Sequence, residues 1–212
     1  MARPRKDLRE RLLASARALF LRDGVDGASL RAIAKGAGAS LGMVYYYFPS
    51  KDELFFAVVE DVYAGLLAEL SVALKPDATP EARLQRLFLR MAAIDAREVD
   101  TLRLVLREML LSSERLEKLL GRVATGHLPM MLEFVLEARA LGKMREAQHP
   151  VVQAASSVLL AVVPQLALRR VRASVPELPT PEPEDLARMF LDVLLGGIAA
   201  RPAQGGGGGM ES

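Results

Sequence analysis

The sequence predicts an all-α protein, and three observations support this prediction. The chain is rich in Leu, Ala, Arg and Glu, which are strong helix formers. Helix-capping and helix-ending signals recur along its length, whereas no Asn-Gly or Asp-Gly turn lies between alternating apolar runs. The chain has 212 residues, 51% of them apolar and 25% charged, which excludes a disordered class and leaves room for one or two domains with a sizeable core.

The first four predicted helices cover residues 7–22, 30–37, 41–47 and about 51–74. In the first, the apolar side chains fall on one stripe, and Gly24 follows its end because glycine accepts the left-handed conformation needed there. Ser29 and Ser40 have N-cap chemistry for the second and third helices, which are separated by a tight glycine turn. Residues 50–53 match the capping box that begins the fourth helix.

Five further helices are predicted at about 80–96, 100–112, 114–142, 149–172 and 182–200. Thr79 and Pro80 begin the first of these, since proline suits the first helical position. A similar Thr-Pro pair at 180–181 begins the last one. Residues 201–212 form a Gly-rich tail that we expect to be flexible.

Composition excludes several classes of site. The chain has no cysteine, so disulfides, thiolate metal sites and thiol nucleophiles are ruled out. His127 and His149 are too few for a multi-histidine centre, and we expect no metal and no cofactor.

The charged start lacks the apolar core of a signal peptide. Residues 151–168 are apolar, but two serines, two glutamines and a proline interrupt them, which favours burial against protein and a cytoplasmic location without membrane contact.

The small net charge of +2 hides an asymmetry. Residues 1–51 carry ten Lys/Arg and four Asp/Glu, a net charge of +6, whereas residues 52–212 carry a net charge of −4. A basic segment on an acidic body indicates that the segment binds a polyanion. The short helices around the glycine turn form a helix-turn-helix pattern, which places the second helix of the pair in the DNA major groove.

Basic and aromatic side chains around this pattern agree with DNA binding. Arg3, Arg5 and Lys6 form a basic arm, although a solubilising terminus explains them equally well. Tyrosines occupy positions 45–47, where hydroxyls can hydrogen-bond phosphate oxygens. Three consecutive residues cannot share one helix face, so we expect the first two to face DNA and Tyr47 to lie partly in the core.

The residues around the turn also match a known pattern. They are Ser29-Leu30-Arg31-Ala32-Ile33-Ala34, Ala37-Gly38-Ala39-Ser40, Gly42, Tyr45, Tyr47-Phe48 and Lys51-Asp52-Glu53-Leu54. This pattern resembles the signature of the tetracycline-repressor (TetR) family. The resemblance implies a homodimer with a helix-turn-helix DNA-binding domain at residues 1–51 and a helical effector-binding and dimerisation domain at residues 52–200, followed by the tail at 201–212.

By position in that pattern, the resemblance implies that eight residues face DNA: Ser29, Arg31, Ser40, Gly42, Met43, Tyr45, Tyr46 and Lys51. Position 41, often basic in the family, is Leu here, and Met43 replaces a more common small residue. The recognition helix therefore offers few donors to base edges. We expect Met43 to contact a thymine methyl group, as apolar side chains do.

The effector prediction is based on the types of side chain in the predicted helices at about 80–142. Aromatic residues are few after residue 51 and tryptophan is absent, whereas Leu, Val and Met are frequent. Such a lining suits a flexible fatty-acyl molecule better than a flat cationic drug. The candidate effector-binding residues are Met91, Arg103, Arg107, Met109, Phe134 and Pro164. Pro164 would kink its helix. One of the two arginines would meet an anionic head group, although both arginines could instead belong to a solvated surface.

The dimerisation prediction rests on two apolar surfaces that one chain of this size cannot cover. They belong to residues 151–168 and to the last helix. The candidate dimerisation residues are Val158, Val162, Met189, Phe190, Val193 and Leu194. We expect them to form a four-helix bundle across a two-fold axis, and a palindromic operator follows from that symmetry.

An enzyme and a protein-binding dimer are the two alternatives to a DNA-binding regulator. Gly38-Ala39-Ser40-Leu41-Gly42 matches the G-x-S-x-G nucleophile elbow of α/β-hydrolases, but that motif needs a preceding strand and the sequence predicts a helix there. A dimer that binds another protein without DNA is the third hypothesis, against which the basic N-terminal segment argues. The sequence therefore predicts a ligand-responsive DNA-binding repressor that is not an enzyme.

Overall fold

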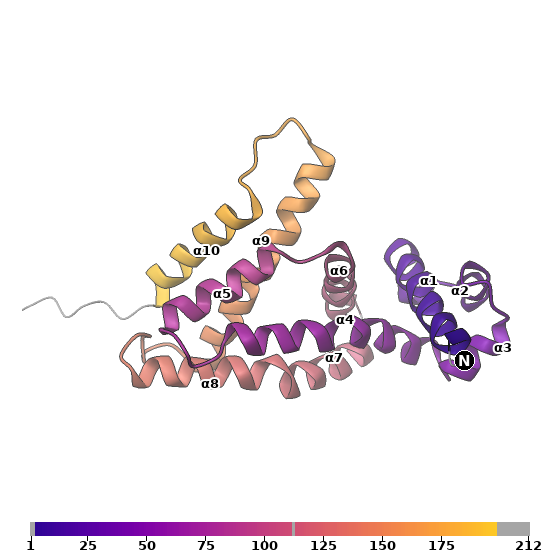
Figure 1. Ribbon diagram of the computed structural model, residues 1–212, viewed down its shortest axis with the longest axis horizontal. Coiled ribbons are helices and arrows are strands. Elements are labelled where there is room, and N and C mark those ends of the chain that lie inside the picture. The colour runs from indigo at the N-terminus through magenta and orange to yellow at the C-terminus, as the bar shows by residue number, and fades with distance from the viewer. Residues whose placement is uncertain (1–2, 112, 199–212) are drawn as a thin grey trace, which may run out of the picture. The chain divides into compact units, whose positions relative to one another are not determined.

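The computed structural model describes residues 3–111 and 113–198. Within these residues the chain forms ten helices and no strand, which confirms the all-α prediction (Figure 1). In chain order they are α1 (Arg3–Gly27), α2 (Leu30–Gly36), α3 (Leu41–Tyr47), α4 (Lys51–Ala73), α5 (Pro80–Ala92), α6 (Ala96–Leu111), α7 (Ser113–Thr125), α8 (His127–Ala140), α9 (Pro150–Ser174) and α10 (Pro183–Ile198).

The described residues divide into two compact units. The first contains residues up to 72 together with residues 94–127, and the second contains residues 73–93 and those from 128 onwards. Helices α6 and α7 therefore belong to the same unit as the helix-turn-helix. The boundary expected at residue 51 lies inside the first unit and does not separate compact units.

Local signals explain how the first unit begins and ends its short helices. Gly24 adopts a φ of 80° and kinks α1 where the sequence predicts the helix end. The Ser29 hydroxyl accepts a bond from the Ala32 backbone N–H at 3.5 Å, and the Ser40 hydroxyl accepts one from the Met43 N–H at 3.3 Å. Both predicted N-caps are confirmed, and each satisfies an N–H that the first helical turn leaves unpaired.

One apolar core joins the helices of the first unit. Phe20 of α1 and Phe55 of α4 are fully buried and meet edge to face, with ring centroids 6.2 Å apart. Ile33 from α2 and Val44 from α3 pack into the same core. So does Leu104 from α6, so the helix-turn-helix and α6 share one set of apolar contacts.

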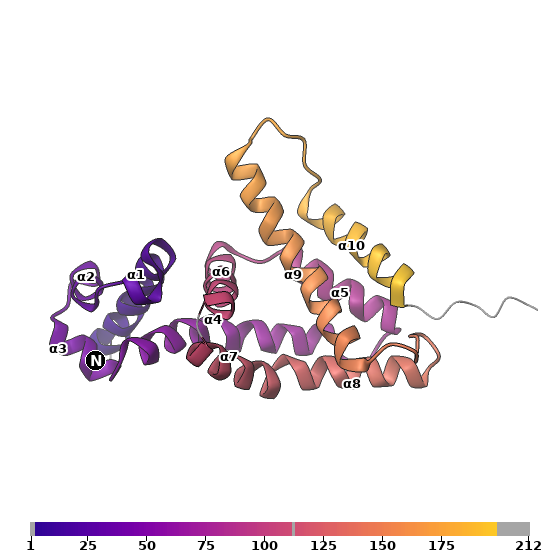
Figure 2. The same cartoon turned by 180° about the vertical axis from the view of Figure 1, so that it is seen from behind.

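The second unit is built on α5, α9 and α10, which pack on one another, with α9 and α10 antiparallel (Figure 2). Buried Arg83 connects α5 to the end of α4 and to α8. Its Nε donates to the Leu74 carbonyl at 2.9 Å and its Nη1 to Glu137 at 2.7 Å. Its guanidinium lies 4.8 Å from the ring centroid of Phe134. The charge is therefore paired and stacked, as burial requires.

Helix α9 is the one described helix that is long and apolar enough to cross a membrane, with a mean hydropathy of 1.8. Its inward side carries buried polar residues that have protein partners. Gln165 donates to the Pro183 carbonyl at 2.8 Å, and Ser157 donates to the Gln153 carbonyl at 2.8 Å. These contacts favour its interpretation as the core helix of the second unit.

One predicted helix is wrong. The segment 114–142 is divided into α7 and α8, with the break at Gly126. The hydroxyl of Tyr63 on α4 accepts a bond from the His127 backbone N–H at 3.1 Å, and a Cβ on Gly126 would lie 2.2 Å from that hydroxyl. A tertiary contact that the local pattern does not contain therefore replaces the continuous helix.

The boundary between α5 and α6 also differs from the prediction. The sequence predicts helices at 80–96 and 100–112, whereas α5 ends at Ala92 and α6 begins at Ala96. Asp95 and Glu98 form a reciprocal capping box: the Glu98 N–H donates to Asp95 Oδ1 at 2.7 Å, and the Asp95 N–H donates to Glu98 Oε2 at 2.9 Å. This signal was present in the sequence and was missed.

Substitution of Leu104 tests whether α6 is part of the core of the first unit. Leu104 is 1% exposed, whereas Leu110 on the same helix is 86% exposed. We expect Leu104→Ala to lower the free energy of unfolding by about 2–5 kcal/mol, because it removes buried contacts and leaves a cavity. Leu110→Ala is the matched control and should change it by less than about 0.5 kcal/mol. Urea denaturation measures both, and equal effects would contradict the packing described here.

Candidate nucleic-acid interface

Helices α2 and α3 form the predicted helix-turn-helix, and α1 supports it from behind. Ser15 of α1 donates to the Ile33 carbonyl of α2 at 2.9 Å. A Cβ on Gly36 would lie 2.4 Å from the Ser15 hydroxyl, so the two helices approach closely where α2 ends. Gly38 has a φ of 65° in the turn, a conformation that glycine adopts without strain. The hydrogen bond, the close approach and the glycine turn together define the direction of α3 relative to α2.

Helix α3 has an inner and an outer face. Val44 is buried, as is Phe48 at the C-cap. Tyr45 and Tyr46 are 51% and 67% exposed, whereas Tyr47 is half-buried and packs against the core, 5.3 Å from the Tyr46 ring. The predicted division of the three tyrosines between surface and core is confirmed. Their contact with DNA stays a prediction.

Most other residues implied by the resemblance are also accessible. Ser29, Arg31, Ser40 and Gly42 are exposed, and Met43 is half-buried. The two serine hydroxyls accept helix N–H groups, and each keeps its own hydrogen for donation to a phosphate oxygen. Arg3, Arg5 and Lys6 lie in the first turns of α1, and their side chains are outside the described part of the structure.

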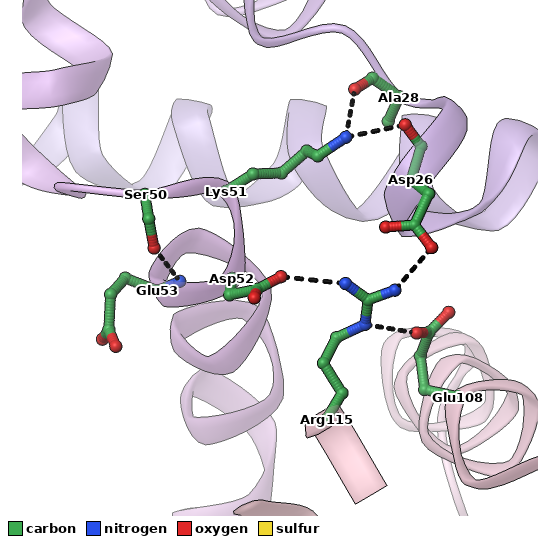
Figure 3. A network of polar contacts seen from close by, with 8 residues as sticks. All are labelled: Asp26, Ala28, Ser50, Lys51, Asp52, Glu53, Glu108 and Arg115. Atoms are coloured by element: carbon green, nitrogen blue, oxygen red, sulfur yellow. Dashed lines mark hydrogen bonds and ion pairs between the residues drawn. The ribbon is translucent and has the colours of Figure 1, made fainter. Parts of the chain in front are cut away.

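Lys51 has a more internal position than its predicted phosphate contact requires. Its Nζ donates to the Asp26 carbonyl at 2.7 Å and to the Ala28 carbonyl at 3.3 Å (Figure 3). Two of the three ammonium donors therefore bind the segment that connects α1 to α2. The phosphate contact of Lys51 stays a prediction, and the structure gives this residue a role in holding the segment that precedes Ser29.

Sequence reasoning missed a cluster of charges next to this segment. Arg115 of α7 donates from Nε to Glu108 at 2.6 Å, from Nη1 to Asp52 at 2.9 Å and from Nη2 to Asp26 at 2.7 Å (Figure 3). Burial alone would lower the pKa of the guanidinium, but these bonds raise it above its ordinary value. The bond from Arg115 also lowers the pKa of the Asp26 carboxyl. Only Glu108 lies near Arg115 in sequence, so no local pattern signals the cluster.

The candidate effector residues do not gather in one compact unit. Arg103, Arg107 and Met109 belong to the first unit, whereas Met91, Phe134 and Pro164 belong to the second. Their participation in a common site stays a prediction.

The two arginines of that set have separate surroundings. Arg103 is exposed and pairs with Asp100 at 3.7 Å, which favours the solvated alternative. The Arg107 guanidinium lies against α1: Nη1 is 3.5 Å from the Leu21 carbonyl oxygen, and a Cβ on Gly24 would lie 2.8 Å from Nη2.

The candidate dimerisation residues differ in accessibility. Met189 and Val193 are well exposed on α10, whereas Phe190, Val158 and Val162 are half-buried. Leu194 is a correction: it is buried within a single chain, because α10 packs against α5 and α9, and it is not accessible to a second copy.

Comparison with known proteins identifies the N-terminal domain. Residues 12–58 match the family model described as "Bacterial regulatory proteins, tetR family". This domain belongs to the TetR family. The match covers most of α1, all of α2 and α3 and the start of α4, so the resemblance noted from the sequence is confirmed where its motif lies.

Relatives of this TetR domain are named repressors. The HTH-type transcriptional repressor NicS of Pseudomonas putida is 35% identical over 80 residues, which are 37% of this chain and 37% of NicS. The HTH-type transcriptional repressor KstR2 of Mycobacterium tuberculosis is 36% identical over 90 residues, which are 42% of this chain and 44% of KstR2. The aligned region thus spans less than half of either relative.

A solved structure extends the likeness of fold to most of the chain. FadR from Bacillus subtilis, solved in complex with stearoyl-CoA, is 17% identical with a TM-score of 0.69, covering 89% of this chain and 98% of FadR. At this identity the likeness concerns the fold alone, a helix-turn-helix domain followed by a helical C-terminal domain.

The hydrolase alternative lacks its structural context in the described residues. Ser40 follows α2 and caps α3, whereas a nucleophile elbow joins a strand to a helix. Its hydroxyl accepts the Met43 N–H, which is N-cap geometry. The family model that matches this segment describes regulatory proteins, in agreement with this geometry.

Proposed function

We propose that this chain is a transcriptional repressor that binds a palindromic operator as a homodimer and is released from it by a small apolar effector. The observation that carries the proposal is the outer face of α3, which is capped by Ser40 and presents Tyr45 and Tyr46 to solvent inside the segment that matches the TetR family. Both relatives described above are named as repressors. Such a protein acts in the cytoplasm, where its DNA target lies.

A DNA-binding surface on α3 and a protein-binding surface there differ in how they respond to an added negative charge. A surface that reads DNA lies beside phosphates, so one added negative charge opposes binding. A surface for an uncharged protein partner has no such sensitivity. The N-cap position at Ser40 allows this charge to be added without loss of the helix, because Asp, Asn and Ser are nearly equal as N-caps.

We therefore expect Ser40→Asp to weaken DNA binding by about tenfold or more, whereas Ser40→Asn, which preserves the cap without the charge, remains close to the parent. DNA sites selected from random duplexes by the wild-type chain provide the probe, and a gel shift at two salt concentrations measures affinity. Circular dichroism checks that both variants stay folded. Equal affinity of the two variants would contradict the placement of α3 on DNA, and failure of the wild type to select a site would contradict the function.

The homodimer proposal is supported by apolar residues that remain exposed on α9 and α10. Leu159 and Val163 of α9 and Met189 and Val193 of α10 are all more than a third exposed, although their helices pack together. An exposed apolar set on two adjacent helices is typical of an interface that a second copy covers. A two-fold axis there would form a four-helix bundle.

Val193→Glu tests this interface. We expect it to give monomers that bind the palindrome at least about tenfold more weakly, since a charge cannot be buried without a partner. Val72→Glu is the matched control: Val72 is 59% exposed, Val193 is 63% exposed, and Val72 lies on α4 in the first unit. Light scattering measures the mass of both variants. A dimeric Val193→Glu protein would place the interface elsewhere.

The effector proposal is a flexible fatty-acyl compound. Its support is the composition of the chain beyond residue 51, in which Leu, Val and Met exceed aromatic residues, and each buried CH₂ group contributes about 0.8 kcal/mol. The neighbour FadR was solved with stearoyl-CoA. Binding need only favour a conformation that fits the operator poorly.

A titration of the operator complex tests this proposal. We expect a long-chain acyl-CoA to release DNA, whereas free coenzyme A, which has the same charged group without the chain, does not. Fluorescence anisotropy of labelled operator measures the release. Release by a cationic dye that does not bind DNA, with none by acyl-CoA, would overturn the fatty-acyl assignment and leave the DNA-binding proposal intact.

A further inference from the structure

Arg115 is the point at which four segments of the first unit meet. It comes from α7, and its three carboxylate partners come from α6 (Glu108), from the first turn of α4 (Asp52) and from the end of α1 (Asp26). Each guanidinium nitrogen has its own carboxylate, at 2.6–2.9 Å. A planar fork of donors fixes direction as well as distance, which a lysine in the same place would not do.

Stability alone does not account for this cluster. The Arg115 side chain is 9% exposed and that of Glu108 is 4% exposed, so both charges lie largely outside solvent. Desolvation of a buried ion pair offsets much of its Coulombic attraction, and apolar residues of similar volume are often as stable. The directional bonds therefore provide a defined geometry more than net stabilisation.

The geometry that they define is that of the segment leading into α2. The Asp26 carboxylate binds Arg115, and the Asp26 and Ala28 carbonyls bind the ammonium of Lys51 (Figure 3). Lys51 directly precedes Asp52, the second carboxylate that Arg115 holds. The segment 26–28 is thus fixed from α7 and from α4, immediately before the Ser29 cap of α2.

We propose that Arg115 is a positioning residue for DNA binding: from α7, through Asp26 and Asp52, it fixes the entry into α2 and so the placement of the α2–α3 surface. This inference rests on the proposed function and adds the residue through which α7 acts on that surface. Arg115 itself does not touch DNA in this account. The family match, which ends at residue 58, does not include it.

Removing the charge of Asp26 distinguishes a positioning role from a purely electrostatic one, because the two predict opposite changes in operator affinity. Asp26 is 83% exposed as a side chain, so Asp26→Asn should not unfold the chain. Losing a negative charge near DNA would by itself strengthen binding. If Asp26 positions α2, operator affinity should instead fall about fivefold or more. The matched control is Asp23→Asn, which removes a carboxylate three residues earlier in α1 that pairs with its neighbour Arg22 at 2.7 Å. This variant should bind equally or more tightly.

A second variant tests Arg115 directly. Arg115→Met alone would leave Glu108 buried without its cation, so the double variant Arg115→Met/Glu108→Leu replaces the pair by apolar side chains of similar size. We expect its thermal midpoint to stay within a few degrees of the parent while operator affinity falls about tenfold. Parent-like affinity of this folded variant, or of Asp26→Asn, would overturn the inference.

Amide hydrogen exchange of the DNA-free full-length chain provides a readout that does not depend on the proposed function. We expect faster exchange at residues 30–47 in Asp26→Asn and in the double variant than in the wild type or in Asp23→Asn, because α2 loses a fixed entry. Unchanged exchange there would contradict positioning by Arg115. A wild-type chain that binds no DNA would contradict the proposed function, and the exchange data would still decide the role of Arg115.

Discussion

The burial of two very short helices is the constraint on which the rest of the structure depends. Helices α2 and α3 have seven residues each, and isolated helices of fewer than about 12–15 residues are marginal in water. Their stability must come from packing, and Ile33, Ala34 and Val44 of these helices lie in a core with α1 and α4. That core continues to Leu104 of α6 and Leu119 of α7. The rigidity of the candidate DNA-binding surface therefore depends on the whole first unit and not on α2 and α3 alone.

Apolar packing and charge have different tasks in this unit. The core holds the helices together without fixing direction, since apolar contacts are non-directional. Arg115 and Lys51 add directed bonds at the segment between α1 and α2. Because α6 and α7 provide Glu108 and Arg115, the proposed positioning would connect both helices to the entry of α2 through bonds inside one compact unit.

The sequence was sufficient wherever the determining signal is local. The N-caps at Ser29 and Ser40 and the outward tyrosines depend on neighbours within a few residues, and they were predicted. At Gly24 the sequence predicts the end of the helix, whereas the structure has a kink inside α1. The break at Gly126 depends on Tyr63, and the partners of Arg115 lie up to 89 residues away, so periodicity contains no trace of them. The first compact unit extends past the expected boundary at residue 51 for the same reason: motif patterns end there, but contacts between distant helices continue.

Helices α2 and α3 share one apolar core, and by our inference their stability, with α6 and α7. Native-state hydrogen exchange of the wild-type chain in low concentrations of denaturant tests it most directly, since amides of one cooperative unit open with one free energy. We expect the most protected amides of α2, α3, α6 and α7 to merge into a single opening reaction as denaturant is added. Loss of protection in α6 and α7 while α2 and α3 stay closed would contradict it.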